Sequence, residues 1–228
     1  MGVKSKKRWI TSPRELEALV QDFGFLPFFK NEFDGFSVEE YTPQELWFSR
    51  ENDGPWEWKG PVARGKQCAY GKLFRGKAGF VSREWFPDLC NWRRDGYDFD
   101  ARYEDGLASR KDKEIYETTR ENGSMLTKEI KAACGYGKQG KKGFDTIITR
   151  LQMQTYLTVA DFEYAKDKLG NPYGWGLARY AAPETLFGED FLRQAYKREP
   201  EESRTRIFNH LILLLPDADD DEIRRIIG

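Results

Sequence analysis

The chain has 228 residues, of which 39% are hydrophobic and 33% are charged, and its formal net charge is −1. This composition is typical of a globular protein and excludes a disordered or strongly basic one. No apolar run approaches the roughly 20 residues that cross a bilayer, and the basic start lacks the apolar segment of a secretory signal. We therefore expect a cytoplasmic protein without a membrane partner.

Few residue types are present in a pattern suited to metal or nucleophilic chemistry. The three cysteines are an odd number without CxxC spacing, which argues against a disulfide framework and a zinc ribbon. His210 is the only histidine, and its apolar surroundings predict a helix. This excludes a Ser-His-Asp triad and a histidine-rich metal site. We expect no metal and no organic cofactor.

The N-terminal region, residues 1–108, is predicted to be aromatic-rich and α+β. Ser12-Pro13-Arg14-Glu15 is a capping box that predicts a helix, and Thr42-Pro43-Gln44-Glu45 repeats the device. The conformation of Asn52–Arg64 stays open. Cys68–Phe74 and Ala78–Ser82 predict a β-hairpin, and a further helix is expected from Pro87 to Arg93 or Arg94.

Residues 41–103 contain five of the seven tryptophans and fourteen of the 34 aromatic residues. Large aromatic residues mostly serve packing, which favours a core, although such density also suits a base-stacking, sugar-binding or small-ligand surface. The acidic run Asp95–Gly106 lacks the spacing of a calcium-binding EF-hand loop. It is predicted to be a polar connector.

Residues 109–183 show the element order of a winged helix-turn-helix. A Ser109/Asp112 cap predicts a helix over 112–121, Thr127 is expected to cap a helix over 128–134, and a third amphipathic helix is predicted over 144–152. Strand-like runs at 156–164 and 173–180 follow, and they are expected to pair as a wing. In DNA-binding winged helices the third helix enters the major groove of the DNA. Other winged-helix domains bind only proteins.

Charge is uneven along this half. Residues 126–180 hold nine Lys or Arg and five Asp or Glu, a balance of +4, whereas residues 181–228 hold seven and eleven, a balance of −4. A localised basic segment is compatible with DNA binding or with internal pairing. The candidate DNA contacts are Lys138, Gln139, Lys141 and Lys142 before the third helix, then Arg150, Lys166 and Lys168.

Four stretches resemble an uncharacterised bacterial family described as related to AlkZ, a winged-helix DNA glycosylase. They are PWEWK (55–59), AYGKLFRGKAGFVSREWFP (69–87), RRDGYDFD (93–100), and FDTIITRLQMQTYL with GNPYGWGLARYAAPE (144–184). The resemblance implies a DNA-repair role on alkylated or crosslinked bases. In the glycosylases a short Gln-aliphatic-Gln or Gln-x-Asp motif lies where a helix meets a strand, and Gln152-Met153-Gln154 has the first form.

The resemblance thus makes Gln152 and Gln154 candidate catalytic residues, whose amides would orient a water. Because residues two apart on a strand project from one face, we expect both amides to lie in one polar cleft. The alternative is that the motif simply ends a helix and begins a strand.

Residues 184–228 are predicted to close the structure with helices around Phe191–Ala195, Ile207–Leu214 and Ile223–Ile227. The acidic run 217–222 is expected to begin the last helix rather than to bind metal. Together the sequence predicts an α+β protein with a winged helix-turn-helix. The expected partner is DNA, and the alternative is another protein.

Overall fold

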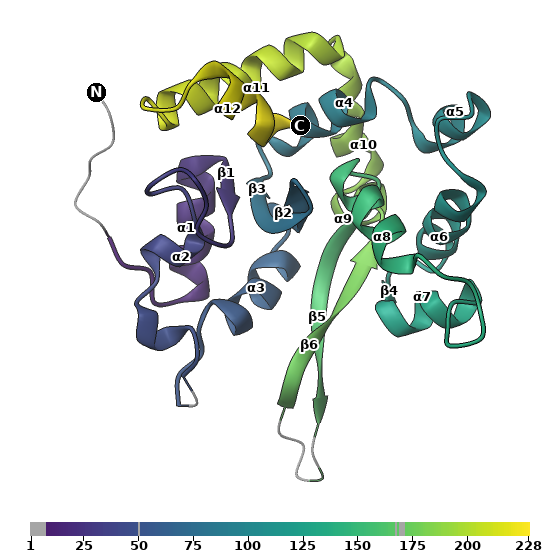
Figure 1. Ribbon diagram of the computed structural model, residues 1–228, viewed down its shortest axis with the longest axis horizontal. Helices are drawn as coiled ribbons and strands as arrows, with labels where there is room; N and C mark the ends of the chain where they lie inside the picture. The colour runs from purple at the N-terminus through teal and green to yellow at the C-terminus, as the bar shows by residue number, and fades with distance from the viewer. Residues whose placement is uncertain (1–7, 50, 167, 169–171) are drawn as a thin grey trace.

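The computed structural model describes residues 8–49, 51–166, 168 and 172–228. Over these residues the fold is mixed α+β, with two three-stranded antiparallel sheets surrounded by helices (Figure 1). No helix in the described part of the chain combines the length and the apolar character needed to span a membrane.

The chain enters the fold through a capped helix, as the sequence predicts. Helix α1 spans Pro13–Phe23, and the Ser12 hydroxyl accepts a hydrogen bond from the Glu15 amide at 3.3 Å. The second capping motif does not act in this way. Thr42 donates its hydroxyl to the Val38 carbonyl at 2.9 Å, and only a 3-10 turn, η1 (Gln44–Leu46), follows. The prediction of a full helix there is wrong because the capping side chain is already engaged.

The remaining N-terminal elements build the first sheet and one helix beside it. Strand β1 (Phe25–Pro27) and helix α2 (Val38–Tyr41) precede α3 (Pro55–Arg64), which fills the segment that the sequence left open. The predicted hairpin is confirmed as β2 (Cys68–Phe74) and β3 (Lys77–Ser82). Strand β3 lies between β1 and β2.

The side chains of successive strand residues in this sheet belong alternately to two hydrophobic clusters, one on each face of the sheet. Leu26, Tyr70 and Phe80 belong to the larger cluster, whereas their strand neighbours Phe25, Ala69 and Val81 belong to the smaller one. Because successive strand residues point to opposite faces, the sheet is buried on both sides. The larger cluster also continues into residues 115–182. The division of the chain at 108/109 and 183/184 stays a prediction.

Helices α4 (Phe86–Arg94) and α5 (Phe99–Glu104) connect the first sheet to the second half of the chain. The predicted helix after Pro87 is thus confirmed, and part of the acidic connector is helical. In the second half, α6 (Arg110–Glu121), α7 (Thr127–Ala133) and α8 (Phe144–Met153) agree with the three predicted helices. Helix α7 begins one residue early, because Glu129 caps it through the Leu126 amide at 2.7 Å.

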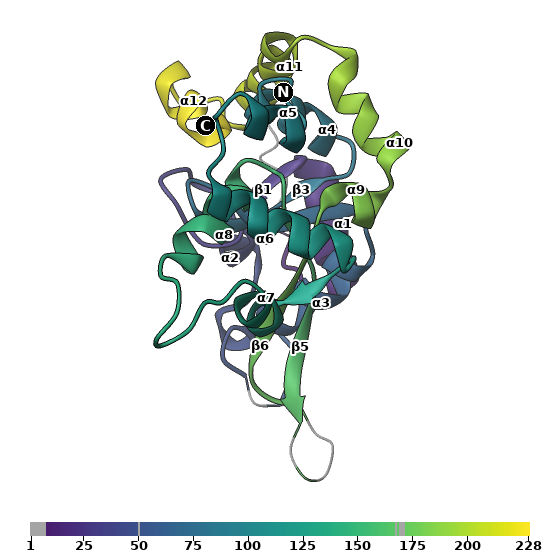
Figure 2. The same cartoon turned by 90° about the vertical axis from the view of Figure 1, so that its right-hand side faces the viewer.

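The second sheet contains the predicted strand pair and one strand that the sequence analysis missed. Strands β5 (Thr158–Lys166) and β6 (Pro172–Ala181) pair antiparallel, as predicted. The additional strand is β4 (Met125–Leu126), which pairs with β6 and gives the order β4-β6-β5. Two views show that β5 and β6 project as a long ribbon from the body of the molecule (Figures 1 and 2).

The C-terminal residues form helices, and the last two of them lie at the end of the molecule opposite to the ribbon (Figure 1). In chain order the helices are α9 (Pro183–Phe187), α10 (Glu189–Leu192), the 3-10 helix η2 (Arg193–Lys197), α11 (Pro200–Leu214) and α12 (Asp220–Ile227). The acidic run caps α12 as expected, with the Asp219 carboxylate accepting from the Glu222 amide at 2.7 Å. His210 is a helical residue, and its ring stacks on Trp85 with centroids 4.3 Å apart.

Candidate nucleic-acid interface

The loop between α7 and α8 is compact. Its Gly140 amide donates to the Gly137 carbonyl at 3.1 Å, and the Lys141 amide donates to the Gly135 carbonyl at 2.9 Å. A Cβ on Gly140 would lie 2.3 Å from the Gly135 oxygen, so the fold-back needs glycine at that position. The buried Tyr136 ring packs against Phe144 and anchors the loop on α8. The loop therefore presents its polar side chains from a defined backbone.

All four loop candidates, Lys138, Gln139, Lys141 and Lys142, have exposed side chains. They differ in their partners. The Lys141 ammonium lies 2.5 Å from the Glu114 carboxylate of α6, whereas Lys138 and Lys142 form no ion pair with any described residue. Two of the three lysine charges are therefore available to an external anion such as a phosphate.

Arg150 is brought to α6 rather than left on an open surface. Its guanidinium Nη2 and Nε lie 2.5 and 3.0 Å from one carboxylate oxygen of Asp112, a residue that is 3% exposed. The other oxygen of Asp112 accepts hydrogen bonds from the amide and hydroxyl of Ser109. Arg150 thus ties α8 to the cap of α6, which makes it a structural ion pair in this conformation.

The ribbon β5–β6 contributes few available cations among the residues described. Lys168 is exposed, and the side chain of Lys166 lies outside the described residues. Nearer the body of the molecule, Arg179 is paired with both Glu163 and Glu129. Arg64 of α3 lies 2.5 Å from Asp161. The base of the ribbon is therefore a set of paired charges.

Gln152 lies in the interior. Its side chain is 1% exposed, its carbonyl oxygen accepts from the Lys72 amide of β2 at 3.0 Å, and its amide nitrogen donates to the Ile148 carbonyl at 3.0 Å. A Cβ on Gly71 would lie 3.1 Å from the same carbonyl oxygen, so Gln152 packs closely over the strand. The amide forms a buried link between α8 and the N-terminal sheet.

Gln154 does not join Gln152 in one cleft. Gln152 is the penultimate residue of α8 and Gln154 is its half-buried C-cap residue, and residues two apart on a helix point to nearly opposite sides. The expectation of a shared face is wrong because the helix extends to Met153 and replaces the strand geometry that the motif was assumed to have.

Thr155, directly after the motif, has a φ of +61°, a left-handed conformation that β-branched residues rarely adopt. Arg94 holds it there, donating to its carbonyl at 2.7 Å and to its hydroxyl at 3.3 Å. The Arg94 guanidinium is also 2.5 Å from the Glu184 carboxylate. Burial alone would lower the pKa of Arg94, but Glu184 outweighs it and raises that pKa well above its usual value. The junction after α8 is therefore locked by a charged residue.

Arg93 fixes the same junction from another side. Its guanidinium donates to the carbonyls of Leu73, Met153 and Ile227 at 2.6, 3.0 and 3.0 Å. The last two carbonyls belong to the C-terminal ends of α8 and α12, where the helix dipoles favour a cation. The β2–β3 hairpin, α8 and α12 thus meet at one side chain.

The β2–β3 hairpin carries basic residues that sequence reasoning did not place near α8. Lys72, Arg75 and Lys77 are exposed, and the Lys72 ammonium donates to the Thr149 hydroxyl at 3.1 Å. A Cβ on Gly76 would lie 3.6 Å from a Thr149 methyl and 3.9 Å from the Met153 sulfur. Residues 68–82 contain three basic residues and no acidic one, which is the signal that could have identified this contact.

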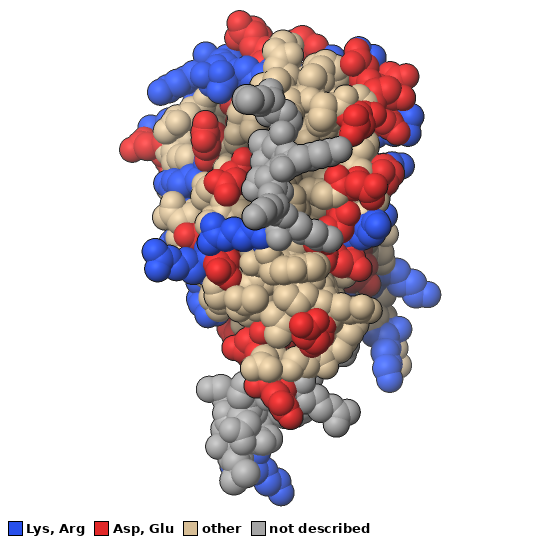
Figure 3. Space-filling model, turned by 90° about the vertical axis from the view of Figure 1, so that its left-hand side faces the viewer, with Lys and Arg blue, Asp and Glu red and all other residues tan. Residues whose placement is uncertain are grey.

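The hairpin contacts the C-terminal half of α8 and leaves its first turn open, where Asp145 and Thr146 are exposed. The opposite side of the molecule, which carries α1 and α2, shows acidic and basic side chains interspersed (Figure 3). Its described surface has no continuous basic patch. The open N-terminal end of α8 and its loop are therefore the better candidate for an anionic partner.

The described residues contain no group of three or more His, Cys, Asp or Glu arranged to hold a metal ion. All three cysteines are buried and free. Burial raises the pKa of the Cys68 thiol to about 12 and that of Cys90 to about 11. Because thiolate is the reactive form, these two thiols are poor nucleophiles near neutral pH.

Comparison with known proteins identifies the family but no individual relative. Neither the curated proteins nor the solved structures contain a match to this chain. The model of a family described as AlkZ related matches residues 10–228. Because that match extends over nearly the whole sequence, the protein belongs to the AlkZ-related family.

Proposed function

We propose that this protein associates with duplex DNA through a winged helix-turn-helix formed by residues 109–183. The observation that carries the proposal is the pair of available lysines, Lys138 and Lys142, directly before α8. Helices α6, α7 and α8 followed by the β5–β6 ribbon have the order of such a fold, and β4 completes a three-stranded sheet. Its third helix is the one that enters the major groove.

In this arrangement the N-terminal end of α8 approaches the DNA. The loop lysines would pair with phosphates, and helix N-termini add favourable partial charge for the same anions. The exposed first turn would face the groove, with Thr146 able to contact bases. Lys168 near the end of the ribbon and Lys72 on the hairpin are second-rank phosphate contacts.

Membership of the AlkZ-related family supports a link to DNA repair. We propose glycosylase-like action on alkylated bases, whose positive charge makes them good leaving groups. Gln154 is the member of the glutamine pair that is available to orient a water, since Gln152 is engaged with the backbone on both sides. The test is base excision from alkylated duplex, which Gln154→Ala should abolish without a loss of thermal stability.

Binding is tested by the salt dependence of the dissociation constant for a labelled duplex. Each phosphate contact contributes about 0.9 to the slope of log affinity against log salt concentration. Changing Lys138, Lys141 and Lys142 together to Ala should therefore lower the slope by about 1.8, which is the contribution of the two lysines that have no ion-pair partner among the described residues. A control removes three exposed cations elsewhere, Lys30, Lys197 and Arg193. An unchanged slope in the loop variant would show that the loop does not contact DNA.

A second candidate function is a protein-interaction module. It is favoured by the partial covering of α8 by the hairpin and by the internal pairing of Lys141 and Arg150. Winged helices also serve as interaction domains. Absence of duplex binding at low salt, with the protein folded, would favour this function over the first.

A further inference from the structure

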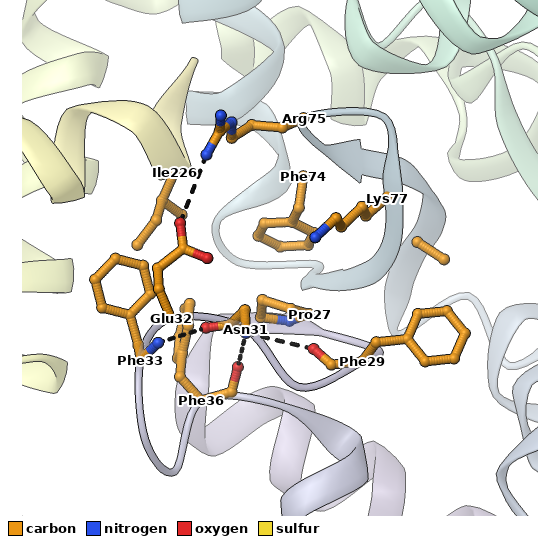
Figure 4. A pocket seen from close by; sticks show the side chains of 11 residues that line it. Pro27, Phe29, Asn31, Glu32, Phe33, Phe36, Phe74, Arg75, Lys77 and Ile226 are labelled. Atoms are coloured by element: carbon orange, nitrogen blue, oxygen red, sulfur yellow. Dashed lines mark hydrogen bonds and ion pairs between the residues drawn. The ribbon is translucent and has the colours of Figure 1, made fainter.

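An apolar cavity of about 200 Å³ lies beside the β2–β3 turn (Figure 4). Three segments far apart in sequence enclose it: the loop after β1, the turn itself and helix α12. Its walls include the rings of Phe33, Phe36 and Phe74 and the side chain of Ile226. An apolar cavity of about 150 Å³ is enough for a benzene ring, so this one has room for a planar heterocycle.

The cavity is preformed. The amide nitrogen of Asn31 donates to the Phe36 carbonyl at 2.8 Å, and its oxygen accepts from the Phe33 amide at 2.9 Å. These bonds fix the loop that presents both rings. On the opposite wall the Phe74 ring lies over Gly79, where a Cβ would come within 2.4 Å of it. A preformed site loses little conformational entropy when a ligand binds.

The rim of the cavity is cationic. Arg75 is paired with Glu32 at 3.5 Å, whereas Lys77 forms no ion pair with a described residue and is exposed. Counting Arg75 and Lys77 against Glu32 leaves one positive charge at the opening. A planar aromatic ring that carries an anionic group, such as a nucleotide, complements both the walls and the rim.

The same turn contacts the C-terminal half of α8, the helix whose N-terminal end is the proposed DNA surface. Gly76 lies against Thr149 and Met153 of α8, and Arg93 joins the hairpin to the end of that helix. Figure 2 shows α8 and α12 toward the same side of the molecule, and Ile226 of α12 lines the cavity together with Arg75 and Lys77 of the hairpin. A strand that follows α8 would therefore pass the opening of the cavity.

We propose that this cavity binds a single unpaired nucleotide, its base between the phenylalanine rings and its phosphate on Lys77. The proposal rests on the proposed DNA association for the source of the nucleotide. The Asn31 amide is engaged with the loop backbone, so the walls offer few hydrogen bonds to the edges of a base. The site should therefore accept different bases, as aromatic stacking sites do.

The first experiment compares three labelled duplexes that differ only at one position. One is fully paired, one carries a single-base bulge, and one carries an abasic bulge with the same backbone. Stacking of one base predicts that the full-length protein binds the base bulge at least about five-fold more tightly than the abasic bulge. Equal affinity for the two bulges would overturn the proposal.

Variants of the cavity test whether it causes this preference. Ile226→Trp places a larger side chain in the cavity and should abolish the preference while leaving affinity for the paired duplex unchanged; Ile226→Leu is the matched control and should retain it. Lys77→Gln, on the surface, should weaken binding of the base bulge, and Lys30→Gln should not. A preference that survives in folded Ile226→Trp and in Lys77→Gln would contradict the assignment.

A second arm measures binding of free 5′-deoxyadenosine monophosphate and of deoxyadenosine by calorimetry. The monophosphate should bind more tightly than the nucleoside, and Ile226→Trp should remove the binding of both. Binding of the free nucleotide without a bulge preference would overturn the strand-bound site and leave a site for a free nucleotide. Binding in neither arm would overturn the proposal completely. Loss of paired-duplex binding alone would contradict the proposed function but not the cavity.

Discussion

The two ends of α8 have opposite surroundings. At the N-terminal end, a compact glycine-containing loop holds exposed lysines, and the first turn of the helix is open. At the C-terminal end, Gln152 is buried, Thr155 has a left-handed backbone and two arginines bind the surrounding carbonyls. One helix thus combines an end that can meet a partner with an end that cannot rearrange without losing buried polar bonds.

This difference explains why the loop lysines remain candidate contacts for a partner whereas Gln152 does not remain a candidate catalytic residue. Exposed lysines on a fixed loop can exchange water for phosphate at little cost. The Gln152 amide would first have to leave the Lys72 amide without its side-chain partner and give up its own bond to the Ile148 carbonyl. Three changes test this contrast and a fourth tests the base of the ribbon, and the four are ordered by the size of the expected effect.

The largest effect is expected from Arg94→Ala. This change leaves the Glu184 carboxylate without its buried partner and releases Thr155 from its strained conformation. Breaking such a pair by removing one member destabilises by about 3–5 kcal/mol. The free energy of unfolding in urea measures the effect. The double variant Arg94→Leu/Glu184→Leu should recover much of the loss, and a loss below about 1 kcal/mol in the single variant would contradict the locked junction.

The next largest effect concerns pH and the contact of β5 with α3. Lys59 is 5% exposed, with its ammonium 4.5 Å from the ring centroids of Trp56 and Phe162. Burial lowers its pKa to about 8, against a partly opposing effect of Glu57. Between about pH 8 and 10.5 the unfolded chain binds the additional proton, so stability rises with pH by up to about 3 kcal/mol from this group.

The measurement is the difference in unfolding free energy between wild type and Lys59→Met across that pH range. The difference cancels the titration of buried tyrosine and cysteine residues common to both proteins. Wild type should gain stability relative to the variant as the pH rises. A constant difference would show that Lys59 is not desolvated at the base of the ribbon.

A smaller effect is expected from Gln152→Ala. It leaves the Lys72 amide and the Ile148 carbonyl without their side-chain partner, which costs about 1–3 kcal/mol for buried groups. Gln154→Ala is the matched control at the half-buried position and should change stability by less than about 0.5 kcal/mol. Urea denaturation compares the two. Equal stability losses would remove the distinction between the buried and the available glutamine.

The smallest effect on stability is expected at the open end of α8. Lys138→Ala/Lys142→Ala removes two charges without ion-pair partners among the described residues, so the unfolding free energy should change by less than about 0.5 kcal/mol. Lys141→Ala, which breaks the contact with Glu114, is the comparison within the same loop and should cost up to about 1 kcal/mol. A large loss in the double variant would mean that these lysines support the loop rather than serve a partner.

Local sequence signals determined most of the secondary structure. The Ser12 and Ser109 caps, the apolar period of residues 144–151 and the paired strand-like runs act over a few neighbouring residues, and the corresponding elements are present. The loop lysines could also be recognised from sequence, because a charge-rich and glycine-rich segment between helices lies at the surface. The two-residue strand β4 is too short to give such a signal, and only its pairing with β6 forms it.

The environment of each candidate side chain was decided by tertiary structure. The sequence shows two glutamines two residues apart, but the helix reaches Met153, and β2 then buries one amide and leaves the other at the helix end. Lys72 is 80 residues from Gln152 in the chain, yet its backbone amide binds that side chain. Such contacts depend on where the hairpin packs against α8, and no local period or capping motif encodes that position. The chain itself specified the elements through short-range hydrogen bonds and apolar spacing, whereas burial and long-range pairing determined which of their polar groups remain available.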